Sequence, residues 1–199
     1  MRILNQHDRS TNTVIVIGSG RSGTTMLCRI CATLGFDWIR TDERNMESLQ
    51  LRQAVQSGDM ETIRAAVLPS DRQGVKLHMM ASKAVLRAAE CFPSPRFICP
   101  LRDTLAATES HLRQHVNGDL SRALKLFAVM NGNAVRSAVE ISDHYPVAIV
   151  SYVDVMSKPD SSTHELASFL GVEWTPESAA EVVPRDPRYQ PVPDAKNET

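Results

Sequence analysis

Short runs of apolar residues alternate along this chain with longer segments in which apolar residues recur every three or four positions. The short runs predict strands, and the longer segments predict amphipathic helices. Strands are expected at 14–17, 75–80, 96–101 and 147–152. Helices are expected at 24–34, 46–56, 59–67, 82–91, 104–116 and 120–141, and from Ser161 or Ser162 to about Gly171. Because the two kinds of element alternate, we predict an α/β fold of three layers, in which helices flank a mainly parallel sheet.

Capping residues and glycines mark several of the expected helix ends. Asp59 and Ser82 stand where N-caps are expected, and Gly35 stands where a C-cap is expected. Gly132 lies inside the longest helical segment, 120–141, so a bend or an interruption of this helix is open at that position. Residues 36–45 show no period and are expected to be irregular.

The length of 199 residues predicts one domain with a single core. The expected elements fall within residues 13–171, whereas residues 175–199 are polar and rich in proline. Prolines disfavour a long helix or a central strand in this last stretch. We therefore expect residues 1–199 to form a single domain whose C-terminal segment wraps the surface or frays.

The charge balance is close to neutral, with a formal net charge of −1, so no basic field favours nucleic acid as a partner. No apolar run approaches the about 20 residues that a membrane span needs. Residues 1–12 are polar and lack the apolar core of a signal peptide. These features predict a cytoplasmic protein that binds neither nucleic acid nor a membrane.

Four cysteines are expected to be free thiols in a chain without an export signal. Cys28 and Cys31 have the spacing of a redox or zinc pair, but no second pair lies at ligand spacing. Packing within the first helix is therefore the favoured interpretation. His111 and His115 share a helix face without a third ligand at matching spacing, and no metal site is predicted.

The strongest chemical signal is the glycine-rich stretch that joins the first expected strand to the first helix. Its glycines are Gly18, Gly20 and Gly23. They allow the backbone N–H groups to point to one spot before the helix N-terminus, which predicts an anion site, most often for phosphate. The spacing approaches a nucleotide P-loop with Thr25 as its hydroxyl residue, but Thr24 stands where lysine is expected. The basic residue is Arg21 instead, which weakens the case for a Mg·ATP or GTP site.

The octet Gly18–Thr25 resembles the 5′-phosphosulfate loop of sulfotransferases that use PAPS (3′-phosphoadenosine 5′-phosphosulfate). Later in the chain, Arg102 is followed eight residues on by Ser110, as in that family's 3′-phosphate element. Thr104 stands where the family usually has proline, and Tyr152 begins a segment similar to the family's Tyr-Glu-Asp-Leu stretch. These elements occur in the family's order, and the resemblance implies a P-loop NTPase-like fold.

The resemblance also implies a site for PAPS, with adenosine 3′,5′-bisphosphate (PAP) as the product. The implied binding residues are Gly20, Arg21, Ser22, Gly23, Thr24, Thr25, Met26, Arg102, Ser110 and Tyr152. Met26 stands where cytosolic-type members carry a tryptophan stacked on adenine, so adenine recognition is expected to be looser or to use another side chain. The Arg-Lys-Gly motif of some members is missing, and Arg185 or Arg188 is a candidate to replace it.

A second motif suggests where catalysis occurs. The two-residue period of a strand places Lys76 and His78 on one face, and Lys76-Leu77-His78 is similar to the Lys-x-His of cytosolic-type sulfotransferases, in which the histidine is the base. The resemblance implies that His78 takes the acceptor's proton while Lys76 and Arg21 stabilise developing negative charge. Glu47 is the second candidate for the base, and a buried histidine beside a snorkelling lysine is the structural alternative.

The function that the resemblance implies is metal-independent, in-line transfer of the sulfuryl group from PAPS to a hydroxyl or amine of a small-molecule or glycan acceptor. Two alternatives stay open. One is a nucleotide kinase or related phosphotransferase with an altered loop, and the other is a nucleotide-binding module without catalysis. The sequence does not identify the acceptor, and it leaves a homodimer open without specifying one.

Overall fold

The computed structural model describes residues 1–5, 11–77, 80–112, 119–174, 176 and 179. Within these residues, six strands form one sheet in the order β1-β6-β5-β2-β4-β3. The strands are β1 (Arg2–Leu4), β2 (Thr13–Val16), β3 (Asp37–Trp38), β4 (Gln73–Lys76), β5 (Pro95–Leu101) and β6 (Val147–Ser151). Neighbours pair in parallel except at the edge, where β1 runs antiparallel to β6.

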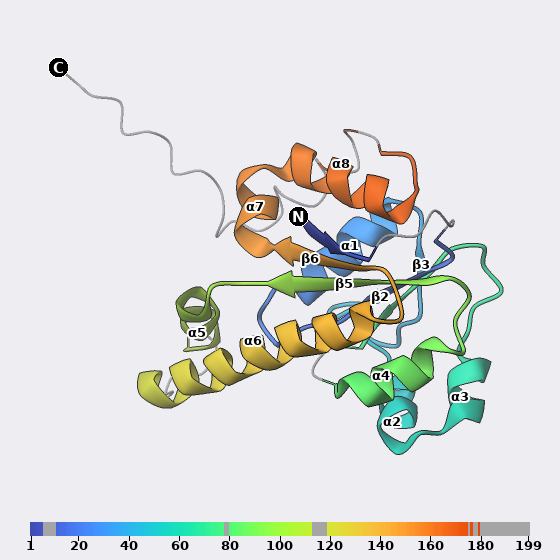
Figure 1. Cartoon of the computed structure of the whole chain (residues 1–199), viewed down its shortest axis with the longest axis horizontal. Helices are drawn as coiled ribbons and strands as arrows, with labels where there is room; N and C mark the ends of the chain where they lie inside the picture. The colour runs from blue at the N-terminus through green and yellow to red at the C-terminus, as the bar shows by residue number, and fades with distance from the viewer. Residues whose placement is uncertain (6–10, 78–79, 113–118, 175, 177–178, 180–199) are drawn as a thin grey trace.

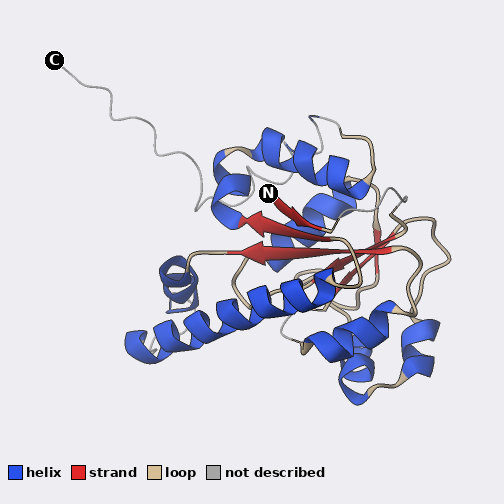
Figure 2. Cartoon of the chain, viewed as in Figure 1, coloured by secondary structure: helices blue, strands red, loops and turns tan. Residues whose placement is uncertain are grey.

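Helices cover both faces of this sheet and make the three predicted layers (Figure 1). They are α1 (Thr24–Thr33), α2 (Leu49–Ser57), α3 (Met60–Ala65), α4 (Ser82–Ala89), α5 (Thr104–Leu112), α6 (Leu120–Ser142), α7 (Tyr152–Ser157) and α8 (Pro159–Leu170). The α1, α7 and α8 helices share one core with the sheet, and α2, α3, α4 and α6 share the other. Helices alternate with strands along most of the chain, so the predicted α/β class is confirmed (Figure 2).

The central strand β2 supplies both cores. Val14 and Val16 pack on the α1 side, and Ile15 packs on the α6 side. Each of these side chains is fully buried. Burial on both faces explains why the strand has a continuous apolar sequence rather than an alternating one.

Two short strands were not predicted. β1 lies in the polar N-terminal stretch, and β3 lies within the residues expected to be irregular. Both are edge strands of two or three residues, held by backbone pairing to β6 and β4 rather than by an apolar run of their own. Such strands leave almost no hydrophobic pattern in the sequence.

Several predicted boundaries were wrong. The α2 helix begins at Leu49 rather than 46, because Ser48 caps it by accepting a hydrogen bond from the Leu51 amide at 3.3 Å. β4 begins at Gln73, two residues before the predicted strand. The α8 helix begins at Pro159, before the predicted serines.

The predicted capping residues had mixed outcomes. Asp59 caps α3 through the Thr62 amide at 3.1 Å, as predicted. Ser82 is not an N-cap, since Ala81 holds that position and the Ser82 hydroxyl instead bonds Glu140 of α6. The α6 helix runs through Gly132 without interruption.

The reactivity of the cysteine thiols can test whether Cys28 and Cys31 are packing residues. Burial raises the pKa of both thiols, and it raises the pKa of Cys99 to about 12, whereas Cys91 is only half-buried. We expect iodoacetamide to label Cys91 in the folded protein at least about 100-fold faster than the other three, because the thiolate is the reactive form. Mass spectrometry of the labelled peptides measures these rates. Labelling of the unfolded protein is the control, and faster labelling of Cys28 or Cys31 than of Cys91 would contradict the packing interpretation.

Candidate functional site

The glycine-rich loop leaves β2 at the carboxyl edge of the sheet and turns sharply into α1. Three of its residues have positive φ, namely Gly18 at 129°, Arg21 at 64° and Gly23 at 102°. Gly23 is the N-cap of α1 and offers no side chain to cap the first turn. The first N–H groups of α1 therefore have no side-chain cap, and such a helix start, with the positive end of the helix dipole, is suited to binding an anion.

Hydrogen bonds and close packing define the shape of this loop. The Ser22 hydroxyl donates to the Ser19 carbonyl at 2.7 Å, and both residues are buried. A Cβ placed on Gly23 would lie 2.5 Å from Cδ2 of Tyr152, so the ring excludes any side chain there. The loop conformation is thus set by its own sequence and by the residue that opens α7.

Four of the predicted nucleotide-binding residues lie together beside the loop. Arg21 donates from Nη2 to the Ser110 hydroxyl at 2.9 Å and, more weakly, to the Ser110 carbonyl at 3.3 Å. Arg102 donates from Nη1 to the Arg21 carbonyl at 3.5 Å, and its guanidinium lies over the Tyr152 ring, 4.4 Å from the centroid. A cation over an aromatic face is a stabilising arrangement. The ends of β5 and β6 therefore meet the loop at one point.

A second cluster lies where β4 ends. The Lys76 ammonium is within 2.9 Å of the Thr25 hydroxyl, the Asn45 carbonyl and Oε1 of Glu47. The Lys76 side chain is only 3% exposed and that of Glu47 only 16%. Arg52 lies 3.8 Å from the other Glu47 oxygen. The structure thus brings both Lys76 and the second candidate base, Glu47, to the start of α1.

A compact turn presents Glu47. The Asp42 carboxylate accepts hydrogen bonds from the Arg44 amide and from the amide and side chain of Asn45. The side-chain bond from Asn45 is the main reason that the pKa of Asp42 is lowered. Met46, buried at 2% exposure, adopts a φ of 59°, which is unusual outside glycine. This turn occupies the place where the sequence predicted the first residues of a helix.

Some predicted residues have no described position. His78 lies outside the described residues, as do His115, Arg185 and Arg188. The other residues named as binding or catalytic all lie in or beside the loop and the two clusters. Among the described residues, no group of three histidine, cysteine or carboxylate side chains has the arrangement of a metal site.

Asn131 of α6 is a further residue beside the loop, and it was not predicted from the sequence. Its side chain bonds Ser19 of the loop at 2.8 Å, and it also bonds Thr104, where α5 begins, at 3.1 Å. One signal could have found it. Phe127, Asn131, Ala134 and Ala138 follow one another at intervals of three or four residues, so they share one face of α6. Phe127, Ala134 and Ala138 are buried on that face. A polar side chain on such a face needs a partner.

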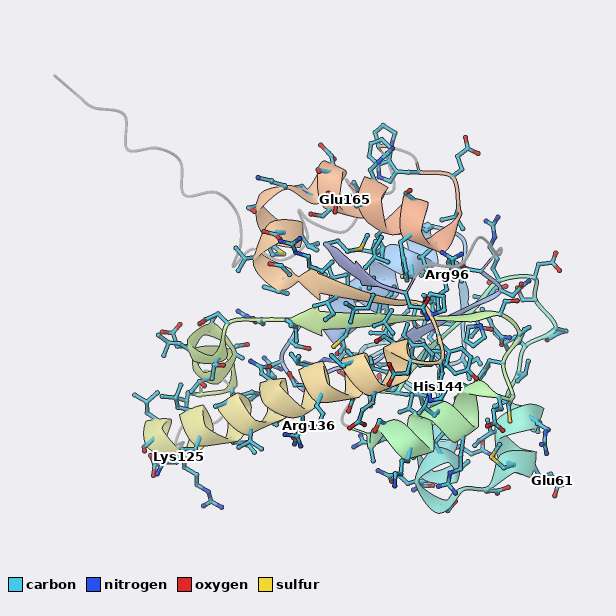
Figure 3. All side chains as sticks on the ribbon, in the orientation of Figure 1. Glu61, Arg96, Lys125, Arg136, His144 and Glu165 are labelled. Atoms are coloured by element: carbon cyan, nitrogen blue, oxygen red, sulfur yellow. The ribbon has the colours of Figure 1, made fainter. Side chains whose placement is uncertain are left out.

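A cavity of about 430 Å³ opens beside the loop. Its walls come from the start of the loop, the connection between β4 and α4, and α6. Ile17, Leu77, Val85 and Ile141 contribute aliphatic surface. Arg136 of α6 also lines the cavity, and Figure 3 labels this residue on the helix. The site therefore combines a cationic loop region with an adjoining space whose walls are partly aliphatic and partly polar.

Comparison with known proteins identifies the fold. No family model and no curated protein matches the sequence, but solved structures do. The sulfotransferase domain of the Synechococcus PCC 7002 olefin synthase matches with a TM-score of 0.54 and 17% identity, over 88% of this chain and 78% of that one. Mouse sulfotransferase SULT7A1, complexed with PAP, matches with a TM-score of 0.59 and 13% identity, over 89% of this chain and 65% of that one. Retinol dehydratase, in a complex with retinol and PAP, matches with a TM-score of 0.55 and 15% identity, over 88% of this chain and 64% of that one.

These likenesses show that the chain has the sulfotransferase fold. At 13–17% identity they carry the fold alone, and the bound PAP and retinol belong to the matched proteins. Within the part of the chain that the structure describes, no helix has the length and hydropathy of a membrane span.

The close approach of the Tyr152 ring to Gly23 predicts that a side chain at position 23 destabilises the fold. We expect Gly23→Ala to lower the free energy of unfolding by about 1–3 kcal/mol, because the new methyl group meets the ring and the positive φ is strained. Gly132→Ala is the matched control. Its methyl group would meet nothing within 4 Å, and we expect a gain of about 0.5–1 kcal/mol inside α6. Urea denaturation measures both, and equal effects would contradict the steric account.

Proposed function

We propose that this protein is a sulfotransferase that moves the sulfuryl group from PAPS to a hydroxyl or amine of a small-molecule or glycan acceptor. The observation that carries the proposal is the meeting of Arg21, Arg102, Ser110 and Tyr152 beside a glycine-rich helix N-terminus. A nucleotide with phosphates at both the 3′ and 5′ positions needs two anion sites, and these residues offer two. The sulfotransferase fold and the PAP-bound neighbours support the same assignment.

The residues divide between the two ends of such a nucleotide. We assign the 5′-phosphosulfate to the loop amides, Thr24, Thr25 and Arg21, with the uncapped start of α1 as the fit that supports it. We assign the 3′-phosphate to Arg102 and Ser110, and the adenine to the surroundings of Tyr152 and Met26. Bound PAPS supplies an activated sulfuryl group.

Proton removal and charge stabilisation would come from the chain itself. Lys76 and Arg21 place two cations beside the loop, where negative charge grows on the departing phosphate oxygens. Their charge would serve where a kinase uses a metal ion. We assign the base to His78, with Glu47 as the alternative because its carboxylate belongs to the cluster at the end of β4, close to the start of α1.

The cavity beside the loop is the proposed acceptor site. Gly18 and Ser19 line it, so an acceptor bound there would lie next to the loop that we assign to the phosphosulfate. Its aliphatic walls suit an apolar acceptor body, and its polar groups on α6 suit hydroxyl or charged substituents. The retinol-bound neighbour agrees with a small-molecule acceptor.

Calorimetric titration tests the nucleotide assignment. We expect PAP to bind at least about tenfold more tightly than AMP, and Arg102→Ala to remove that preference, because charge-assisted hydrogen bonds to a phosphate contribute about 1.5–3 kcal/mol. Arg64→Ala, at the exposed end of α3, is the control and should bind both nucleotides as wild type does.

Other outcomes of the titration would favour the alternatives. Preference for Mg·ATP over PAP would indicate a kinase or phosphotransferase. Selective PAP binding without turnover of PAPS across a broad acceptor screen would indicate a binding module. Equal or absent binding of PAP and AMP would contradict the sulfotransferase assignment.

A pair of substitutions identifies the base once an acceptor is known. We expect His78→Ala to lower kcat about 10²–10⁴-fold with little change in the Kd for PAP, because a base acts on the acceptor rather than on the nucleotide. Glu47→Gln should then have the smaller effect on kcat. His144→Ala and Glu43→Gln are matched controls, since both residues are exposed; Figure 3 labels His144. The reverse ranking of His78→Ala and Glu47→Gln would transfer the role to Glu47.

A further inference from the structure

Asn131 connects two parts of the site that are far apart in the sequence. Its Oδ1 accepts a hydrogen bond from the Ser19 hydroxyl of the loop at 2.8 Å. Its Nδ2 donates to the Arg102 carbonyl at 2.9 Å and to the Thr104 hydroxyl at 3.1 Å. Ser19 is 112 residues from Asn131, and Arg102 is 29 residues away. One side chain therefore bridges the loop and the β5–α5 turn.

The chemistry of these partners allows only one orientation of the amide. The Arg102 carbonyl can only accept, so the nitrogen of Asn131 must face it. The oxygen is then left for Ser19, whose hydroxyl donates. Both N–H groups and the oxygen of the amide are used, so neither aspartate nor leucine can reproduce the bridge. Ser19 is only 2% exposed, and water has little access to replace the bond on the loop side.

The hydrogen bonds of Asn131 differ from the other contacts between the glycine-rich loop and the segment formed by the β5–α5 turn and α5. Arg21 bonds Ser110, and Arg102 bonds the Arg21 carbonyl, but each of these side chains is assigned to the nucleotide. A side chain that turns toward a phosphate gives up part of its contact with the protein. Among the residues that the structure describes, the Asn131 amide bonds Ser19 and the β5–α5 turn, and none of these three bonds uses a group that we assign to the nucleotide as a charged ligand contact.

We propose that Asn131 is a positioning residue that fixes the spacing between the two anion-binding elements. The loop carries the 5′ end of the nucleotide, the turn carries the 3′ end, and the bridge keeps them at the distance that one 3′,5′-bisphosphorylated nucleotide spans. This proposal rests on the proposed function for the identity of the ligand. The bridge itself depends only on the three hydrogen bonds.

Nucleotide selectivity tests the proposal. A ligand with two phosphates depends on the spacing, whereas AMP, with one phosphate, does not. We expect Asn131→Ala to weaken PAP binding about tenfold and AMP binding no more than about twofold, so the selectivity ratio falls about fivefold. A general loss of structure would weaken both alike. Asn131→Asp should match or exceed the loss, because a carboxylate oxygen would then face the Arg102 carbonyl.

Matched variants separate the bridge from unrelated effects. Asn12→Ala removes another asparagine-to-carbonyl hydrogen bond, the one to Asp71 at 3.0 Å, and should leave the selectivity ratio unchanged. Ser19→Ala removes the loop half of the bridge, and combining it with Asn131→Ala should add less than the sum of the two single losses. Full additivity, or an unchanged PAP-to-AMP ratio in Asn131→Ala, would overturn the proposal.

A measurement without nucleotide keeps the two proposals distinguishable. We expect hydrogen exchange at residues 18–23 and 101–104 to become at least about fivefold faster in Asn131→Ala and to stay unchanged in Asn12→Ala. If wild type shows no preference for PAP but exchange accelerates as expected, the nucleotide assignment fails and the bridge stands. Unchanged exchange in both segments would overturn the bridge whatever the nucleotide result.

Discussion

The ring of Tyr152 contacts both the glycine-rich loop and the Arg102 guanidinium. Its Cδ2 atom occupies the space that a side chain at position 23 would need, and the Arg102 guanidinium lies over the ring, 4.4 Å from the centroid. Because Tyr152 follows β6 and Arg102 follows β5, this contact joins the ends of two strands to the loop after β2. Parallel strands release their carboxyl ends at one edge, and the buried ring fixes how three of them meet there.

The charges at this edge are unevenly distributed, and their burial has a cost. Arg21, Arg102 and Lys76 bring three cations to the loop, with Glu47 as the nearest carboxylate to Lys76. Desolvating an ammonium is unfavourable unless its hydrogens have partners, and Lys76 has three acceptors within 2.9 Å. The bisphosphorylated nucleotide that we propose as the ligand is a polyanion, and its charge is opposite to that of these three cations.

The sequence predicted the central parts of this fold because burial there imposes a pattern. β2, β5, β6 and α6 are apolar runs or periodic segments that the two cores require, and their order predicted the α/β class. β1 and β3 were not predicted because backbone pairing to neighbouring strands holds them. The short α7 helix was not predicted either, because its start is defined by a cap, in which the Ser151 hydroxyl accepts a hydrogen bond from the Asp154 amide. The loop, Arg102 and Ser110 were predicted from motif spacing. Asn131 was missed because no motif contains it, and its role depends on which elements the fold brings beside α6.

Lys76 also sets a limit on how the site can respond to a ligand. Its ammonium has three hydrogens, and Thr25, Asn45 and Glu47 already take all three. An anion that recruits Lys76 must therefore displace one of these partners. Two of them belong to the turn that begins at Asp42, and the third belongs to the first turn of α1. An anion that binds Lys76 would therefore loosen the contact of this side chain with the turn or with the start of α1, so ligand binding and the packing of these segments would be coupled through one ammonium group.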